Sequence, residues 1–331
     1  MADQKPPTLI QLPDAWAGKH IVVLGDLCLD EYIVGKAQRL SREAPVPVLE
    51  FQERFVIPGE ACSPALNVQA VGGVAHMVGV VGDDETGATL TKTLNDAGLN
   101  TSGIIIEPGR TSTLKTRVLA SHLFPHQMVR IDRQHKTALA RGTVTKLRKA
   151  LTDAIATADA ILISDYRSNV VEEPLVRYIV QLAKERGLLV AVDSQGAFAK
   201  YRGVSLLRCN KEEAEGYLHR RLLNDAAFAD AGLALQKRLG VGQVVITRGS
   251  DGLSMVDAAG ASHHLAASNP SEVYDVTGAG DAVIAMLTIA LAAGADLLTA
   301  AQVANVAAGL VVRKLGNATV SLGELTDALK S

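Results

Sequence analysis

Residues 273–285 read Val273-Tyr-Asp-Val-Thr-Gly-Ala-Gly-Asp-Ala-Val-Ile-Ala285, and this run is the most informative part of the chain. Gly278, Ala279 and Gly280 open a predicted helix, whose first backbone N–H groups have no partner inside the helix. Together with the helix dipole, these groups form a binding site for an anion such as phosphate. Asp281 follows in the first turn. A phosphoryl group bound there would repel its carboxylate, so a carboxylate at this position is expected to have a chemical role. The run therefore predicts a phosphate site with Asp281 as general base for a hydroxyl nucleophile.

Two simpler interpretations compete with this one. An aspartate at a helix start is often only a cap, and Gly-x-Gly can be half of a dinucleotide-binding fingerprint. That fingerprint needs a small residue at its sixth position, where this chain has Val283, and the run lies near the C-terminus. A cap does not explain the two glycines directly before the carboxylate. Phosphate binding is the interpretation that accounts for the whole run.

Short β-branched runs alternate with amphipathic helical segments along most of the chain. This alternation predicts parallel strands joined by right-handed crossovers, in a doubly wound, mostly parallel α/β sheet flanked by helices. The expected strands are His20–Leu24, Ala75–Val81, Ala160–Ser164, Leu188–Val192 and Gln243–Thr247. The expected helices are Thr145–Ala158, Pro174–Arg186, Asp225–Leu239 and Ala282–Ala293. The last helix is the longest apolar stretch, but it is shorter than the roughly 20 residues that a bilayer span needs.

Two segments, roughly 32–58 and 111–133, break this alternation. Both are rich in β-forming residues and show no helical period, so they predict one small sheet built from two insertions. We expect a single folded unit over residues 1–331, with this sheet as a lid over an active site. An ordinary edge sheet used for dimer contacts is the alternative, and one sheet can serve both purposes.

The chain has 331 residues with 33 basic and 35 acidic side chains, so its formal net charge is −2. This balance predicts binding neither to nucleic acid nor to an anionic membrane surface. The N-terminus lacks the basic start and apolar segment of a secretory signal, so we expect a cytoplasmic protein. Cys28, Cys62 and Cys209 are scattered without a C-x-x-C pair, which predicts reduced core residues rather than a disulfide framework or a zinc site.

The segment Asp275-Val-Thr-Gly-Ala-Gly-Asp281 resembles the C-terminal signature of the ribokinase family, also called the phosphofructokinase-B sugar kinases. The resemblance extends over nearly the whole chain and is strongest to members that phosphorylate D-glycero-D-manno-heptose 7-phosphate at its anomeric hydroxyl. It implies a ribokinase-like fold and an enzyme that uses ATP with Mg²⁺. Further matching pieces are Gly25-Asp26, Leu29-Asp30, Glu43-Ala-Pro-Val-Pro47, Lys115-Thr-Arg117, Val129-Arg-Ile-Asp132, Ser164-Asp-Tyr166, Tyr201-Arg-Gly203, Lys314-Leu-Gly316 and Thr319-Val320.

The resemblance implies roles for residues that would bind the nucleotide. Asp281 matches the catalytic base, and the amides of residues 278–280 would stabilise charge on the transferring γ-phosphoryl group. Asn210 and Glu213 match an N-x-x-E pattern that holds hydrated Mg²⁺, although a helix start capped by Asn210 would look the same. The residues implied to border the nucleotide are Thr247, Arg248, Gly249, Gly252 and Asn305. A tight turn before Gly252 and close helix packing at Asn305 are the simpler alternatives.

For the acceptor, the resemblance implies a role for Asp30, whose carboxylate can bridge two sugar hydroxyls. Lys115 is a candidate for contacting a phosphate, and the alternative is a solvated lid residue. Asp165 follows a predicted strand at its C-terminal end, which is the expected side for ligands. Asp275 and Thr277 resemble positions that hold a monovalent cation in many relatives, so K⁺ is a further candidate cofactor.

The sequence departs from the family pattern at the substrate motif. The pattern Pro-Gly-Gly-Ala-Ala-Asn is Pro58-Gly59-Glu60-Ala61-Cys62-Ser63 in this chain. The substrate pocket is therefore expected to be lined by Gly59, Glu60 and Ser63. Relative to the family pattern, it has gained an acid at Glu60 and lost an amide at Ser63. Three positions that are basic in the heptose-phosphate kinases have become Glu31, Ser168 and Gln195. A substrate phosphate there would lose charge-assisted hydrogen bonds of about 1.5–3 kcal/mol each, unless Arg167 restores one, and Glu60 would repel it.

These observations predict a cytoplasmic, ATP- and Mg²⁺-dependent kinase that phosphorylates a hydroxyl of a sugar or sugar phosphate, most similar to the heptose-7-phosphate 1-kinases. A kinase for an unphosphorylated sugar or a nucleoside is the first alternative. A nucleotide- or sugar-binding sensor without turnover is the second. The expected partners are a small-molecule acceptor and, through the lid sheet, a second copy of the chain, with neither nucleic acid nor membrane.

Overall fold

The computed structural model describes residues 7–121, 126–269 and 274–330, and its centre is a nine-stranded sheet. Its strands are β1 (His20–Gly25), β4 (Val74–Gly82), β5 (Asn100–Glu107), β8 (Ala160–Asp165), β9 (Leu189–Ser194), β10 (Leu206–Asn210), β11 (Gln243–Thr247), β12 (Leu253–Val256) and β13 (Ser262–Leu265). They follow the order β13-β12-β11-β10-β9-β8-β1-β4-β5. All neighbours from β11 to β5 are parallel, whereas β12 and β13 are antiparallel additions at one edge.

The five strands expected from the sequence are all present, with small shifts at their ends. They are rich in Val, Ile and Leu because both faces of a parallel sheet are buried. In β1, for example, Val23 is fully buried and pairs with Met77 on one side and Leu162 on the other. The apolar runs therefore locate the centre of the sheet correctly.

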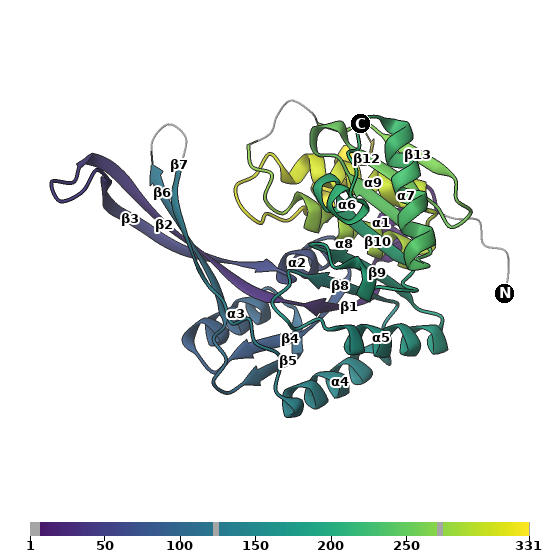
Figure 1. The fold of residues 1–331 in the computed structure, drawn as a ribbon, viewed down its shortest axis with the longest axis horizontal. Helices are drawn as coiled ribbons and strands as arrows, with labels where there is room; N and C mark the ends of the chain where they lie inside the picture. Colours follow the sequence, from purple (N-terminus) through teal and green to yellow (C-terminus); the bar gives the residue numbers. More distant parts are fainter. Residues whose placement is uncertain (1–6, 122–125, 270–273, 331) are drawn as a thin grey trace.

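Helices cover both faces of this sheet (Figure 1). They are α1 (Leu12–Trp16), α2 (Cys62–Ala70), α3 (Glu85–Asp96), α4 (Arg141–Ile155), α5 (Glu173–Arg186), α6 (Lys211–Leu218), α7 (Asp225–Leu239), α8 (Ala279–Ala292), α9 (Leu297–Val311) and α10 (Leu322–Lys330). One core packs α1, α2, α3, α8, α9 and α10 on one face, and a second core packs α4, α5, α6 and α7 on the other. This arrangement confirms the predicted doubly wound fold. None of the described helices is long and apolar enough to cross a membrane.

A second sheet, here called the lid sheet, projects from the body as a long arm (Figure 1). Its strands are β2 (Leu27–Leu40), β3 (Pro47–Glu60), β6 (Thr113–Ser121) and β7 (His126–Arg133), in the order β3-β2-β6-β7. The two segments expected to form a small sheet do so, but β2 begins at Leu27, directly after β1 ends at Gly25. The base of the arm is therefore continuous with the centre of the main sheet.

Polar side chains gather at the carboxyl ends of the parallel strands. Asp26 follows β1, Asp165 ends β8 and Asn210 ends β10. Ligands of doubly wound sheets bind outside this edge. Because the lid sheet leaves β1 at the same edge, its base and the strand ends lie close together.

The three cysteines are buried, unpaired thiols, as predicted. Burial raises the pKa of each thiol above its usual value, so Cys28, Cys62 and Cys209 are neutral at physiological pH. They act as small core side chains.

Candidate active site

The N-terminus of α8 has the geometry of an anion site. Gly278 precedes the helix with a φ of +80°, a left-handed conformation that glycine adopts without strain. The N–H groups of the following turn have no acceptors within the helix. Gly280 is needed for a different reason, because a Cβ at this position would lie 2.6 Å from Nη2 of Arg208. One glycine therefore permits the turn, and the other admits a guanidinium group to the site.

Arg208 on β10 brings a buried positive charge to this place, which the sequence analysis did not predict. Its Nη1 donates to both carboxylate oxygens of Asp193 at 2.9 and 3.0 Å, and its Nη2 donates to Thr247 Oγ1 at 2.8 Å. Burial alone would lower the pKa of Arg208, but Asp193 raises it above its usual value. The available signal was a single arginine in the apolar strand Leu206-Leu-Arg-Cys-Asn. A buried charge of this kind requires a partner. The partner is Asp193, which lies on the neighbouring strand β9.

Asp281 lies in the first turn of α8 and is only 5 % exposed. The hydroxyl of Tyr166 donates a 2.8 Å hydrogen bond to its Oδ1. Burial raises the pKa of Asp281 to about 7, and the negative charge of Asp193 adds to this rise. The hydrogen bond from Tyr166 and the nearby hydroxyl of Ser63, at the start of α2, lower the pKa in part. A carboxyl group with this pKa can exchange protons near neutral pH.

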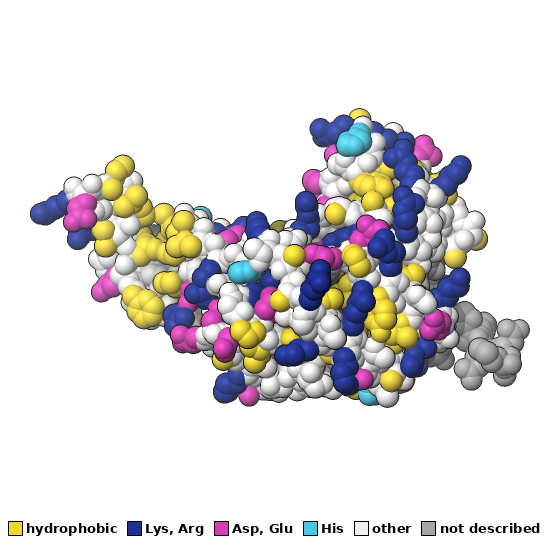
Figure 2. Space-filling view, turned by 60° about the horizontal axis from the view of Figure 1, so that its bottom comes forward, with side chains coloured by type: hydrophobic (Ala, Val, Ile, Leu, Met, Phe, Trp, Pro, Cys, Tyr) yellow, Lys and Arg dark blue, Asp and Glu magenta, His cyan; other side chains and the backbone are white. Residues whose placement is uncertain are grey.

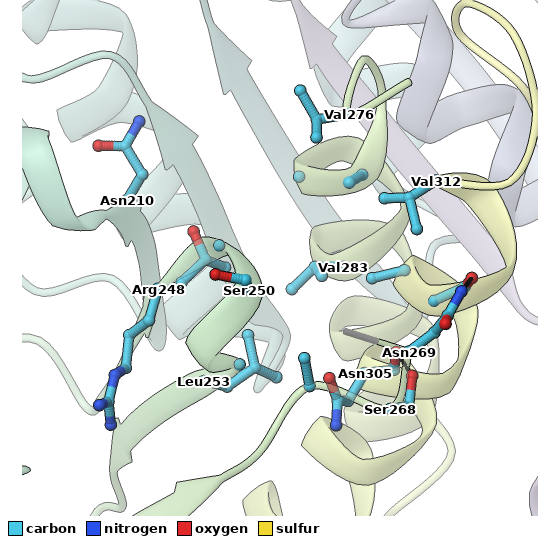
Figure 3. A pocket seen from close by; sticks show the side chains of 18 of the residues that line it. Asn210, Arg248, Ser250, Leu253, Ser268, Asn269, Val276, Val283, Asn305 and Val312 are labelled. Atoms are coloured by element: carbon cyan, nitrogen blue, oxygen red, sulfur yellow. Dashed lines mark hydrogen bonds between the residues drawn. The ribbon is translucent and has the colours of Figure 1, made fainter. Parts of the chain in front are cut away.

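A cavity of about 600 Å³ lies beside the first turns of α8 (Figure 3). Its size is typical of small-molecule sites. Its wall combines apolar side chains, including Leu253, Val283 and Val312, with backbone and amide groups. Six of the residues predicted to bind nucleotide line it: Asn210, Thr247, Arg248, Gly249, Gly252 and Asn305. Ala279 and Gly280 of α8 lie at the same cavity, so the structure brings the predicted phosphate site and nucleotide residues together.

Two of these residues are held by contacts of their own. The guanidinium of Arg248 points away from the cavity (Figure 3), pairs with Asp225 at 2.6 Å and stacks 4.4 Å from the ring centroid of Phe228. The charge of Arg248 is therefore directed away from the cavity. Asn305 donates from Nδ2 to the carbonyl oxygen of Ala266 at 2.7 Å, which fixes the orientation of its amide.

Asn210 and Glu213 form a capping box at the start of α6. Each side chain accepts a 2.8 Å hydrogen bond from the backbone N–H of the other, so the simpler interpretation of this motif is present. Oε1 of Glu213 lies outside the capping box, and burial raises the pKa of this carboxyl to about 6. Within the described residues, no cluster of three or more His, Cys, Asp or Glu side chains could hold a metal directly. Because Mg²⁺ keeps several waters and prefers oxygen ligands, the pair fits a hydrated ion brought by a nucleotide.

The predicted cation residues Asp275 and Thr277 lie in the loop before α8. Oδ1 of Asp275 accepts from the Thr277 N–H at 2.9 Å, and Oδ2 accepts from the Gly316 N–H at 2.8 Å. Burial raises the pKa of Asp275, but these hydrogen bonds bring it below its usual value. The carboxylate therefore joins two loops near α8, and K⁺ binding at this point stays a prediction.

Asp30 lies on β2 at the base of the lid sheet and is buried. Its Oδ1 accepts from Arg117 Nη1 at 2.6 Å, and its Oδ2 accepts from Asn317 Nδ2 at 2.5 Å. A side chain at Gly59 would overlap Oδ2 of Asp30, so this position requires glycine. Neither Arg117 nor Asn317 was predicted at the site, although Arg117 belongs to the matching piece that starts at Lys115.

Glu60 ends β3 with a φ of +52° and is 4 % exposed. Its Oε1 lies 2.6 Å from Nζ of Lys115, and its Oε2 has no hydrogen-bond partner among the described residues. Burial raises the pKa of Glu60 to about 7, although Lys115 lowers it in part. The alternative that Lys115 is a solvated lid residue is wrong, because its side chain is largely buried in this ion pair. We call Asp30, Gly59, Glu60, Lys115 and Arg117 the acceptor cluster.

Asp165 does not join the acceptor cluster. Its Oδ2 contacts Nζ of Lys200 and the hydroxyl of Tyr201, and its Oδ1 accepts from the backbone N–H of Arg167 at 2.8 Å. Asp165 lines a smaller cavity together with Tyr166 and Asp193, and its contact with substrate stays a prediction. Asp26 is a second buried acid at these strand ends, and its Oδ2 accepts from the backbone N–H groups of Tyr166 and Ser168 at 2.8 and 3.1 Å.

The sequence profile of the pfkB family carbohydrate kinases matches residues 19–322 of the chain. The chain belongs to this family. Two relatives named bifunctional protein HldE are similar along nearly the whole chain: that of Caulobacter vibrioides is 40% identical over 98% of it, and that of Geobacter metallireducens is 39% identical over 94%. The chain spans 66% and 63% of the lengths of these two relatives. The predicted membership of the pfkB carbohydrate kinase family is therefore confirmed.

Solved structures of a ribokinase and of a phosphofructokinase share its fold. Ribokinase from Arabidopsis thaliana, solved with ribose and ATP, gives a TM-score of 0.74 at 17% identity and covers 95% of this chain and 99% of its own. Phosphofructokinase-2 from Escherichia coli, in complex with potassium, gives a TM-score of 0.75 at 17% identity and covers 95% of this chain and 98% of its own. These similarities confirm the predicted ribokinase-like fold.

Proposed function

We propose that this pfkB kinase transfers the γ-phosphoryl group of ATP to a hydroxyl of a sugar or sugar phosphate, with Asp281 as general base. The observation that carries the proposal is the place of Asp281. It is buried in the first turn of α8, whose Ala279 and Gly280 line the large cavity. On its other side, Tyr166 links it to Lys115 of the acceptor cluster. A carboxylate between a nucleotide site and an acceptor site is placed for in-line transfer.

Asp281 would act on the acceptor hydroxyl in two ways. An alcohol is far too weak an acid to lose its proton beforehand, so the carboxylate would accept the proton late, as the new oxygen–phosphorus bond forms. Before that step, its contribution is to orient the hydroxyl towards phosphorus. Because Tyr166 occupies Oδ1, the other carboxylate oxygen is the one offered to the acceptor.

The charge of the transferring group would be met by groups at the start of α8. The first-turn N–H groups and the guanidinium of Arg208 would bind the γ-phosphoryl oxygens. Asn210 and Glu213 would hold Mg²⁺ through its waters, and the bound ion would neutralise charge on the nucleotide phosphates. Asp275 and Thr277 remain the candidate residues for K⁺.

Heptose 7-phosphate is the first acceptor candidate, because the motif resemblance points to it and the two HldE relatives are similar over most of the chain. An unphosphorylated sugar or nucleoside is the second. The ion pair of Glu60 with Lys115 favours the second candidate, since it occupies the cation that a substrate phosphate would need. Either reaction consumes ATP, and we place it in the cytoplasm.

The proposal is tested by measuring ADP release from ATP and Mg²⁺ with a panel of sugars, sugar phosphates and nucleosides. We expect turnover with at least one acceptor, and a roughly 10²–10⁴-fold loss of kcat in Asp281→Asn. ATP should still raise the melting temperature of the variant, which separates lost chemistry from lost binding. Stabilisation by ATP without ADP release for any acceptor would instead identify the sensor considered above. Full turnover in Asp281→Asn would refute the role of Asp281.

We also propose that the lid sheet binds a second copy of the chain through one face. By the strand register, Ile33, Phe51, Val118, Val129 and Ile131 point away from the acceptor cluster, and we call this the outer face. Phe51, Val129 and Ile131 are 65%, 48% and 59% exposed. Figure 2 shows apolar side chains gathered over the projecting arm. Exposed apolar patches on a sheet of this kind are typical of an interface.

A further inference from the structure

Glu60 combines two features that destabilise a fold. Its φ of +52° lies in the left-handed region, which favours glycine, and its carboxylate is removed from water at 4 % exposure. Nothing in the turn requires an acid, because the following residues Ala61 and Cys62 are small and apolar. Strain of this kind is typical of residues that serve a binding site rather than packing.

The contacts of Glu60 place it close to the proposed chemistry. Its Oε1 lies 2.6 Å from Nζ of Lys115. That ammonium group lies 5.5 Å from the ring centroid of Tyr166, whose hydroxyl donates to Asp281. Oε2 of Glu60 is buried and has no hydrogen-bond partner among the described residues. An unpartnered buried oxygen of this kind needs a donor, and a bound acceptor can supply one.

Both basic side chains of the acceptor cluster are already paired with acids. Lys115 is bound by Glu60, and Arg117 is bound by Asp30, each at 2.6 Å. A substrate phosphate at this place would have to separate a buried carboxylate from its cation, and it would lie beside the negative charge of Glu60. A sugar hydroxyl, in contrast, can donate to Oε2 of Glu60 without disturbing either pair.

We propose that Glu60 is a specificity-determining residue, which selects an acceptor with a neutral hydroxyl at this end of the sugar and rejects one with a phosphate there. The inference rests on the proposed kinase function and names its acceptor class, an unphosphorylated sugar. Glu60 then has two roles. It pairs with Lys115, and it accepts a hydrogen bond from a hydroxyl of the substrate.

Matched acceptor pairs test this inference: D-glycero-D-manno-heptose and its 7-phosphate, D-fructose and its 6-phosphate, and D-ribose and its 5-phosphate. Wild-type protein should show the higher kcat/KM for the neutral member of any pair that it uses. Glu60→Gly removes the acid, suits the left-handed backbone and frees Lys115. The ratio of kcat/KM for the phosphate ester to that for the neutral sugar should therefore rise roughly tenfold or more. Glu60→Gln keeps the side-chain size and should shift the ratio in the same direction.

Two further variants separate this effect from a general disturbance. Asp159→Asn removes an acid that pairs with Lys19 at 2.8 Å ahead of β8, at the opposite end of the strands from the acceptor cluster, and it should leave the ratio unchanged. The double variant Glu60→Gly with Lys115→Met should lose the gain, because the freed cation is absent. A gain that survives without Lys115 would overturn the mechanism.

The inference is overturned if wild-type protein prefers the phosphate esters, or if wild type and Glu60→Gly show the same ratio. Thermal shifts measured with each sugar but without ATP test the specificity role of Glu60 independently of turnover. If no acceptor is phosphorylated, but neutral sugars stabilise wild type more than their esters and Glu60→Gly reverses this order, the kinase proposal fails and the specificity role holds. Equal stabilisation by both members in both proteins removes the specificity role.

Discussion

The hydroxyl of Tyr166 lies 2.8 Å from Oδ1 of Asp281 and donates a hydrogen bond to it. The same ring lies 5.5 Å from Nζ of Lys115, so the tyrosine stands between the proposed base and the acceptor cluster. Burial and the charge of Asp281 raise the pKa of Tyr166 well above its usual value, which keeps it a protonated donor. Tyr166 therefore occupies Oδ1 of Asp281, which in the proposed mechanism leaves Oδ2 for the acceptor hydroxyl.

Replacing Tyr166 with Phe should change the pH dependence of activity. The base works as a carboxylate, so kcat/KM should rise with pH through about 7 in wild type. Tyr166→Phe removes a hydrogen bond that lowers the pKa of Asp281, so this rise should move to higher pH. Tyr178→Phe is a matched control, because that hydroxyl bonds Thr152 at 2.6 Å on the far helices α4 and α5. A profile that stays in place or moves to lower pH would contradict the role of Tyr166.

Asp281→Asn should stabilise the free protein at alkaline pH. The pKa of Asp281 is raised from 3.8 to about 7 in the folded state, so the folded protein binds the extra proton between these values. The free energy of unfolding therefore falls as pH rises through this window, and the full loss is present above pH 7. Urea denaturation should show the variant about 2–4 kcal/mol more stable than wild type at pH 8, with little difference at pH 4. An equal difference in the free energy of unfolding between variant and wild type at both pH values would exclude the buried charge as the cause.

Gly280→Ala should impair catalysis by displacing Arg208. The added Cβ would lie 2.6 Å from Nη2 of this side chain, so the guanidinium has to move from the start of α8. Loss of a positioned cation at the transferring phosphoryl group should lower kcat by about 10²-fold. Gly142→Ala on α4 is the control, since its Cβ would meet no atom within 4 Å, and it should leave kcat unchanged. Normal turnover in Gly280→Ala would remove Arg208 from the mechanism.

Ile131→Asp should dissociate the proposed dimer. Ile131 is 59% exposed on the outer face, where a buried charge would oppose association. Light scattering should give the mass of two chains for wild type and of one chain for the variant. Leu223→Asp changes a side chain that is 77% exposed outside the lid sheet and should remain dimeric. A monomeric wild type would refute the interface.

The central elements could be predicted because each carries its own signal. Strand β8 is a run of four apolar residues followed by Ser164 and Asp165, and α8 combines a start of small residues with a helix that is apolar after Asp281 except for Thr288. Strand β5 was not predicted, because it begins with the polar residues Asn100-Thr-Ser and lies at the sheet edge. Strand β12 was not predicted either, and it has only four residues, Leu253–Val256. Short or edge strands depend on their neighbours more than on their own pattern.

The same difference applies to the site. Gly278 to Asp281 could be interpreted from the sequence because a helix start has a fixed local geometry. Asp30 and Asn317 are 287 residues apart, and no sequence pattern links their side chains. Arg208 likewise gains its role from Asp193 on the adjacent strand. Local motifs could therefore be recognised, whereas the pairing of their charges depends on the folded sheet.

Asp30 lies opposite Lys115 in the register of β2 and β6, and the next pair is Glu31 and Thr116. Since successive strand residues point to opposite sides, the acceptor cluster and the outer face use alternate residues of the same strands. Deleting a single residue of β2 ahead of Asp30 would move the following side chains of this strand to the opposite faces of the sheet. If both proposals hold, sugar choice and self-association can diverge among descendants of this chain by point substitution, whereas a change of strand length would alter both together.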